Sequence, residues 1–189
     1  MRTTLAAALA AVLAVAAPAA QSNIAKPEKF TAFAVDISNI APRAQTSPVD
    51  IVINRWSTDT ERDRLLAVLR DKGQNALLSE LQKLPVVGYI SSPGSLRYDL
   101  HFARQRPEAE AGRMIFLMTD RYIGAWEAAN RPRTIDYPFM LIQLKVDQGG
   151  KGDGTASIYT KITETNGGVI ELEDFANQPV MLKDVKKVQ

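Results

Sequence analysis

The sequence predicts an α+β fold built on a mainly antiparallel sheet of about nine strands, either a partly closed barrel or a sandwich, with an inserted pair of short helices. Three observations lead to this prediction. Apolar residues alternate with polar ones in about nine segments. The helical period appears in one early region only, whereas a doubly wound parallel sheet needs a helix between successive strands. Short glycine-rich turns join the later segments, and such turns connect antiparallel neighbours.

The alternating segments lie on both sides of the helical region. Their period of two leaves one face apolar and one face polar, as in a sheet that has one face in water. A sheet of this size tends to curl or split so that its edges are protected, so a partly closed barrel and a sandwich are both expected. The predicted strands are residues 30–40, 49–54, 86–90, 96–104, 113–119, 139–146, 156–163, 169–175 and 180–188.

The helical region begins with a capping box. In Thr58-Asp59-Thr60-Glu61 the Thr58 hydroxyl is placed to accept from the Glu61 amide, while the Glu61 carboxylate reaches back to the N-cap amide. Gly73 is placed to end this helix in the left-handed conformation, and Pro85 stops a second short helix. Leucines on one face of each helix predict that the pair packs on the sheet; they are Leu65, Leu66 and Leu69, then Leu77, Leu78, Leu81 and Leu84.

The N-terminus has the three-part pattern of a secretory signal peptide. Arg2 precedes an uncharged run of Ala, Leu and Val, and a small-residue stretch then offers a cleavage site. A retained anchor is the alternative, although the run is shorter than the roughly 20 residues that span hydrocarbon. We therefore expect a secreted or periplasmic bacterial protein. The expected organisation is a signal peptide at residues 1–20, a flexible lead at residues 21–29 and a single α+β domain at residues 30–189.

Composition excludes several kinds of site. The 189 residues include no Cys and one His, which rules out disulfides, thiol chemistry and multi-histidine metal centres. The 23 basic residues nearly balance the 21 acidic ones, and loss of Arg2 lowers the net charge from +2 to +1, so the excess of positive charge expected of a nucleic-acid-binding protein is missing.

The glycine-rich stretch 147–154 lacks the acids of a calcium loop and favours a hairpin turn. We expect no metal, no cofactor, no nucleic-acid partner and no transmembrane segment after the leader.

The densest group of polar and aromatic residues lies at 119–137, in a long connection between two predicted strands. It holds three Arg, three carboxylates, two Tyr and one Trp, and such connections often carry recognition sites. The alternative is a structural role, in which the rings cover the end of the sheet and each Arg pairs with an acid. With two aromatic residues from elsewhere, the predicted ligand-binding residues are Trp56, Tyr98, Arg121, Trp126, Arg133 and Tyr137.

Two further features are weaker candidates. Arg55 and Trp56 precede the capping box, where an Arg can meet an anion near the helix N-terminus. We expect instead that Thr58 and Glu61 satisfy those amides and that Trp56 is a hydrophobic staple. His101 lies on the polar face of its strand, near Asp99. A general base needs a nucleophile or substrate within hydrogen-bond reach, so we expect His101 to be an ordinary hydrogen-bonded residue.

Four groups of residues are distinctive when taken together. They are Arg55-Trp56-Ser57-Thr58 with Glu61-Arg62-Asp63-Arg64-Leu65, then Val87-Gly88-Tyr89-Ile90, Tyr98-Asp99-Leu100, and the stretch from Thr119-Asp120-Arg121 to Pro138-Phe139. These segments resemble a family of uncharacterised secreted bacterial proteins that is common in acidobacteria. The resemblance covers nearly the whole mature chain and implies export and a single domain. It implies no activity, cofactor or catalytic residue.

Three classes of function stay open at this point. The leading hypothesis is an exported non-enzymatic protein that binds an amphipathic or anionic small molecule, a lipid or an envelope component, because aromatic and Arg side chains anchor such ligands and catalytic motifs are scarce. The second is an exported hydrolase-like enzyme that uses Asp120, Glu127 or Asp136 as acid or base. The third is an assembly or interaction subunit of undetermined oligomeric state.

Overall fold

The structure is a computed structural model that describes residues 26–37, 44–94, 97–108, 112–165, 169–176 and 178–188, so the predicted signal peptide lies outside the described residues. The strands are β1 (Glu28–Asp36), β2 (Gln45–Ile53), β3 (Gly88–Ser91), β4 (Tyr98–Leu100), β5 (Phe102–Pro107), β6 (Arg113–Asp120), β7 (Phe139–Val146), β8 (Lys151–Thr165), β9 (Val169–Asp174) and β10 (Val180–Lys187). The helices are α1 (Asp59–Lys72), α2 (Gln74–Leu81), α3 (Ala125–Asn130) and the 3-10 helix η2 (Pro132–Asp136).

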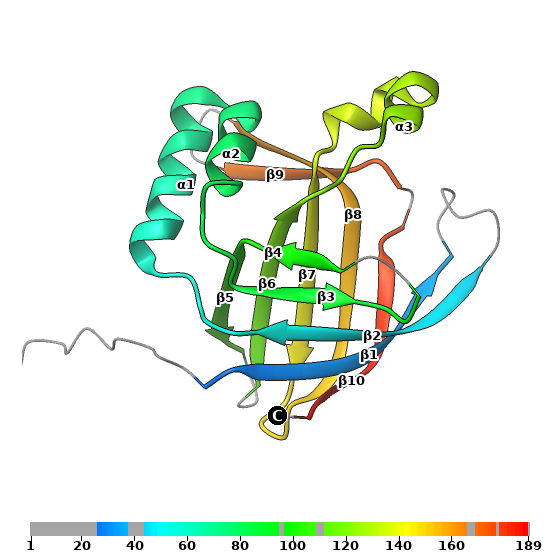
Figure 1. Cartoon of the computed structure of the whole chain (residues 1–189). Helices are drawn as coiled ribbons and strands as arrows, with labels where there is room; N and C mark the ends of the chain where they lie inside the picture. Colours follow the sequence, from blue (N-terminus) through cyan, green and yellow to red (C-terminus); the bar gives the residue numbers. More distant parts are fainter. Residues whose placement is uncertain are drawn as a thin grey trace, which may run out of the picture.

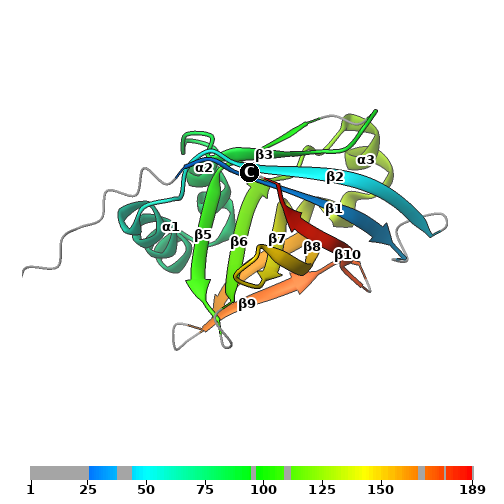
Figure 2. The same cartoon turned by 90° about the horizontal axis from the view of Figure 1, so that it is seen from below.

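The strands form a nearly closed antiparallel barrel. Nine of them follow the order β4-β3-β2-β1-β10-β8-β7-β6-β5, and β9 pairs with β8 outside this path. In Figure 1, β1, β2 and β3 run across β6, β7 and β8, and in Figure 2 β9 lies apart from the β5–β8 layer. The predicted fold class is confirmed, with a barrel as the form that the sheet takes and two short helices inserted between β2 and β3.

The barrel approaches closure where the chain passes from β4 to β5 through His101 alone. β4 pairs with β3 and β5 pairs with β6, so the two ends of the strand order are consecutive in sequence. The His101 amide donates to the Met118 carbonyl at 3.2 Å, and the Thr119 hydroxyl donates to the Asp99 carbonyl at 2.5 Å. The single strand expected at 96–104 is therefore two strands with a bend, because the chain changes partners at His101.

The first inserted helix begins and ends as the sequence predicts, whereas the second ends at Leu81, before the predicted stop at Pro85. The Thr58 hydroxyl accepts from the Glu61 amide at 3.1 Å, and the Thr58 amide donates to the Glu61 carboxylate at 2.8 Å. Arg55 donates to both oxygens of that carboxylate, at 3.0 and 2.8 Å, so Arg55 forms an ion pair with Glu61 that the sequence did not predict. Gly73 has a φ of 76°, a left-handed conformation that suits glycine, and it separates α1 from α2.

The helix pair packs on the outer face of the barrel and is tied to the β4–β5 bend. Its leucines form a second core with Phe139 of β7 and Ile162 of β8. The His101 Nδ1 lies 2.9 Å from the Leu84 carbonyl, so His101 is hydrogen-bonded as expected. The Ser57 amide donates to the Ala103 carbonyl at 2.8 Å, and its hydroxyl accepts from the Ala103 amide at 3.0 Å. The leucines buried in this second core are Leu65, Leu69, Leu77, Leu81 and Leu84.

Charged side chains meet across one end of the barrel. Glu28 of β1 accepts from Arg113 of β6 at 2.5 and 3.1 Å, although β1 and β6 are not neighbours in the sheet, and the Lys187 ammonium lies 3.3 Å away. The Arg113 guanidinium also lies over the Phe30 ring at 5.8 Å. Burial alone would raise the pKa of Glu28, but the hydrogen bonds and charges of Arg113 and Lys187 outweigh it and lower the pKa.

We predict that Glu28→Gln lowers the free energy of unfolding by about 1–3 kcal/mol at pH 7, because Arg113 loses its charged acceptor. The folded-state pKa of Glu28 is lowered, so its contribution is complete above the ordinary value of 4.5 and is lost as the pH falls through the lower folded-state value. Urea unfolding at neutral pH and at about pH 3 tests this, since the difference between variant and parent should shrink at acid pH. Glu171→Gln, which alters an exposed acid of β9, is the control. An equal difference at both pH values would contradict the prediction.

Candidate functional site

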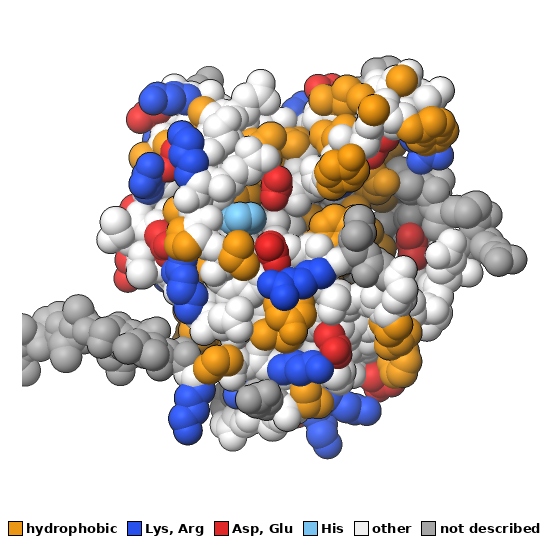
Figure 3. All heavy atoms as spheres, in the orientation of Figure 1, with side chains coloured by type: hydrophobic (Ala, Val, Ile, Leu, Met, Phe, Trp, Pro, Cys, Tyr) orange, Lys and Arg blue, Asp and Glu red, His pale blue; other side chains and the backbone are white. Residues whose placement is uncertain are grey.

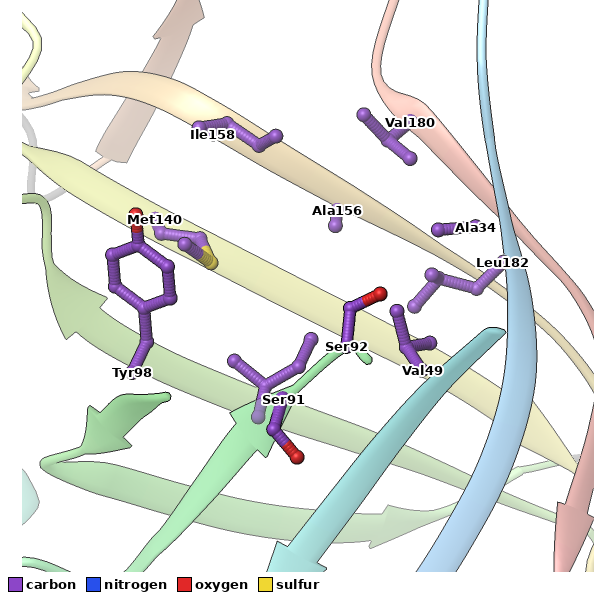
Figure 4. A pocket seen from close by; sticks show the side chains of 11 residues that line it. Ala34, Val49, Ser91, Ser92, Tyr98, Met140, Ala156, Ile158, Val180 and Leu182 are labelled. Carbon is purple, nitrogen blue, oxygen red and sulfur yellow. The ribbon is translucent and has the colours of Figure 1, made fainter. Parts of the chain in front are cut away.

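An apolar cavity of about 140 Å³ lies inside the barrel. Residues from seven strands line it, so the barrel as a whole forms its wall. Figure 4 shows side chains from β8 and β10 facing side chains from β2 and β3 across it. The lining residues are Ala34, Val49, Ile90, Ser91, Ser92, Tyr98, Met140, Ala156, Ile158, Val180 and Leu182.

The cavity exists because small side chains face the interior at this end of the barrel. Along β1 the core residues shrink from Phe30 to Ala32, and Ala34 then lines the cavity. On β8, Ala156 adds only a methyl group to the wall, as Figure 4 shows. Toward the Glu28 end, fully buried side chains as large as Phe30 fill the interior. Protein interiors are otherwise close-packed, so a space of this size reflects the choice of small residues.

Three connections leave the barrel at the cavity end. Ser92 and Tyr98 stand on either side of the connection between β3 and β4. Met140 lies just after the long connection 121–138 that joins β6 to β7, and Val180 is the first residue of β10. These connections therefore surround the mouth of the cavity, the position in which loops of barrel proteins usually meet ligands.

Tyr98 supplies a polar group in this apolar wall. Its ring lies beside Met140 in Figure 4, and its hydroxyl makes no hydrogen bond with any described residue. The Ser92 hydroxyl, by contrast, already donates to the Pro48 carbonyl at 2.8 Å. A tyrosine hydroxyl at the border of an apolar cavity can donate to, or accept from, the polar group of a ligand.

Arg121 is the buried centre of the β6–β7 connection. Its Nη1 donates to both carboxylate oxygens of Glu127, at 2.7 and 2.8 Å, and its Nη2 donates to the Thr134 carbonyl at 2.9 Å. Its Nε donates to the Tyr137 carbonyl at 3.2 Å, and its guanidinium lies 4.4 Å from the centre of the Tyr159 ring. Arg121 is thus fully used in holding the connection together and has little capacity left for a ligand.

Tyr137 belongs to a cluster of rings beside this network. Its centroid lies 5.2 Å from that of Phe175, which in turn lies 6.3 Å from Tyr159. The Tyr137 hydroxyl donates to Glu173 at 2.5 Å, and this bond raises the pKa of Tyr137 and lowers the pKa of Glu173. Burial is the main cause of the raised pKa of Tyr159. The cluster holds the connection against β8 and the end of β9.

The remaining predicted residues occupy two different environments. Trp56 is only 8% exposed and belongs to the main core without lining the cavity. Trp126 is 67% exposed on α3, and the Arg131 guanidinium lies 6.0 Å from the centre of its ring. Arg133 is exposed on η2. The structure therefore brings Arg121 and Tyr137 together, places Tyr98 in the cavity wall and leaves Trp56 apart.

The carboxylates of the hydrolase hypothesis do not meet in a pocket. Asp120 accepts from the Gln82 side chain at 2.9 Å and lies 4.0 Å from His101 Nε2, whereas Glu127 is held by Arg121 and Asp136 is exposed. None of the three lines a cavity described here. Within the described residues there is no group of three or more His, Asp or Glu side chains that could hold a metal ion. In that same part of the chain, no helix is long and apolar enough to cross a membrane.

A second cavity, of about 190 Å³, lies outside the barrel between β9 and strands β5 to β8. The β9 residues Val169, Ile170 and Leu172 are exposed beside it. Its wall is mostly apolar and includes Phe102, Phe116, Met118, Leu141 and Leu172.

Sequence reasoning identified one residue of the inner cavity, Tyr98, and missed the others. The alternation of Phe33, Val35 and Ile37 with Ala34, Asp36 and Ser38 predicts that Phe33 and not Ala34 faces the core. This is wrong, because Phe33 is 48% exposed and Ala34 lines the cavity. The alternation also does not show which strands face each other, so the cavity could not be assembled from it.

No protein-family model, no curated protein and no solved structure matches the chain. Its function must therefore be argued from the cavity, the connections around it and their charges.

Proposed function

We propose that this protein binds a small amphipathic molecule, with the apolar part of the ligand in the barrel cavity and its polar group at the mouth. The observation that carries the proposal is the apolar cavity itself, whose wall includes the small side chains of Ala34 and Ala156 and lies beside the three connections. Concave sites with apolar walls and few polar groups are typical of small-molecule binding.

The volume of the cavity limits the apolar part of the ligand. At about 140 Å³ it is close to an engineered apolar cavity of about 150 Å³ that binds benzene. A ring of that size, or a short alkyl chain, therefore fits without rearrangement. Each buried methylene contributes about 0.8 kcal/mol, so an alkyl chain of several carbons gives useful affinity.

The polar residues at the mouth favour an anionic or hydrogen-bonding group. The Tyr98 hydroxyl lies in the wall and makes no hydrogen bond with any described residue. The Tyr98 hydroxyl can donate to a carboxylate or phosphate on the ligand where that group leaves the apolar wall.

We predict that Ala156→Leu weakens the binding of octanoate about fifty-fold, because the added carbons occupy space for about three methylenes of the ligand. Isothermal titration calorimetry measures the affinity, and thermal unfolding verifies that the variant is folded. Ala67→Leu, on the exposed face of α1, is a matched control and should bind as the parent does. Unchanged octanoate affinity in a folded Ala156→Leu protein would contradict the proposal.

A series of straight-chain carboxylates gives a second prediction. Affinity should rise about fourfold for each added methylene and then level off once the cavity is full. The heat-capacity change of binding should become more negative over the same range, because apolar surface is being buried. A series with no dependence on chain length would argue that the carboxylates bind elsewhere, through charge alone.

A further inference from the structure

Three large apolar side chains project from the β6–β7 connection. Tyr122 is 75% exposed, Trp126 is 67% exposed and Ile135 is 43% exposed. Figure 3 shows hydrophobic side chains gathered over the α3 end of the molecule. Exposed apolar side chains that lie together mark interaction surfaces, whereas single ones are ordinary. These three residues, with Arg131 and Arg133, are called the connection patch below.

The two arginines of the connection patch differ from every other arginine in the described part of the chain. Each of the others lies within ion-pair distance of a carboxylate. Arg131 contacts the face of Trp126, and neither Arg131 nor Arg133 has a carboxylate partner among the described residues. The patch therefore combines exposed rings with two arginines that form no ion pair within the described part of the chain.

We propose that the connection patch docks on the surface of an anionic lipid bilayer. Trp and Tyr rings favour the headgroup region, where an apolar body and a polar tip are both accommodated. Unpaired arginines at the same place are attracted to anionic lipids. Of the acids in this connection, Asp120 and Glu127 are bound internally, so Asp136 alone offsets the two arginines.

The connection is held in a fixed shape before it meets a surface. Arg121 joins Glu127, Thr134 and Tyr137, and the Thr134 hydroxyl donates to Glu127 at 2.5 Å. The patch therefore needs little ordering on binding, which favours association. Because this connection also leads into Met140 in the cavity wall, docking would bring the cavity mouth to the bilayer. The proposal goes beyond ligand binding and does not require an occupied cavity.

Sedimentation with vesicles tests the proposal on the full-length mature chain. The vesicles are phosphatidylcholine alone, or phosphatidylcholine with roughly 30% phosphatidylglycerol to supply anionic headgroups. We expect binding to the anionic vesicles only, and weaker binding at high salt because the charge attraction is screened. Trp126 emission should shift to the blue on binding, while the buried Trp56 should contribute a constant background.

Matched variants separate the patch from general charge. Arg131→Gln with Arg133→Gln should weaken vesicle binding about thirty-fold, at roughly 1 kcal/mol for each arginine. Lys145→Gln with Lys186→Gln removes the same charge from exposed positions near the Glu28 end and should change binding little. Trp126→Phe should abolish the blue shift and leave thermal stability unchanged, because Trp126 is exposed.

Several results would overturn the proposal. The first is that the protein does not bind anionic vesicles. The second is that the arginine and lysine double variants lose vesicle binding equally, and the third is that the Trp126 emission does not change when the protein is bound. Self-association of the protein without lipid that Trp126→Phe disrupts would make the patch a protein interface and would also overturn it. Vesicle binding by Ala156→Leu at parental strength is expected, which keeps this test separate from the test of the cavity.

Discussion

The exchange of strand partners at His101 is the constraint on which the rest of the fold depends. A sheet of this many strands leaves two edges open unless it curls until they meet. Here the two edges are β4 and β5, which are consecutive in the chain, so one bend brings them to the same place. The hydrogen bonds of His101 with Met118 and Leu84 fix that bend on both sides. The helix pair is attached at the same point, since Ser57 bonds to Ala103 next to the bend.

Near-closure makes the interior a volume shared by the nine strands of the barrel, with β9 outside it. A barrel of about this size is wide enough for side chains to fill or for one small ligand to enter. Phe30 fills the interior at the Glu28 end, under the Arg113 guanidinium, whereas Ala34 and Ala156 leave space at the other end. The ionic contacts across one end and the cavity at the other thus follow from a gradient of side-chain size along the same strands. The cavity therefore forms without an additional helix or loop to enclose it.

Local features were predictable from the sequence, and features that depend on strand order were not. The Thr58 capping box and the Gly73 helix end are specified within a few residues, and both occur as expected. The fold class followed from the period of the apolar residues, but the bend at His101 depends on partners on other strands. The two tryptophans illustrate the limit. Trp56 is buried in the core and Trp126 is exposed on the short helix α3, although the residue type is the same.

The buried ion pair of Arg121 with Glu127 explains why the long connection has a neutralised inner part and a positively charged outer part. A buried charge is costly without a partner, so Glu127 is drawn inward to Arg121 and is lost as a partner for the outer arginines. Arg131 and Arg133 then have no carboxylate within ion-pair distance among the described residues. The same pair that holds the connection at the cavity mouth therefore produces the charge on its outer side. The sequence singled out this stretch by composition, and burial of one arginine divides it into an inner part that supports the mouth and an outer part available to a partner.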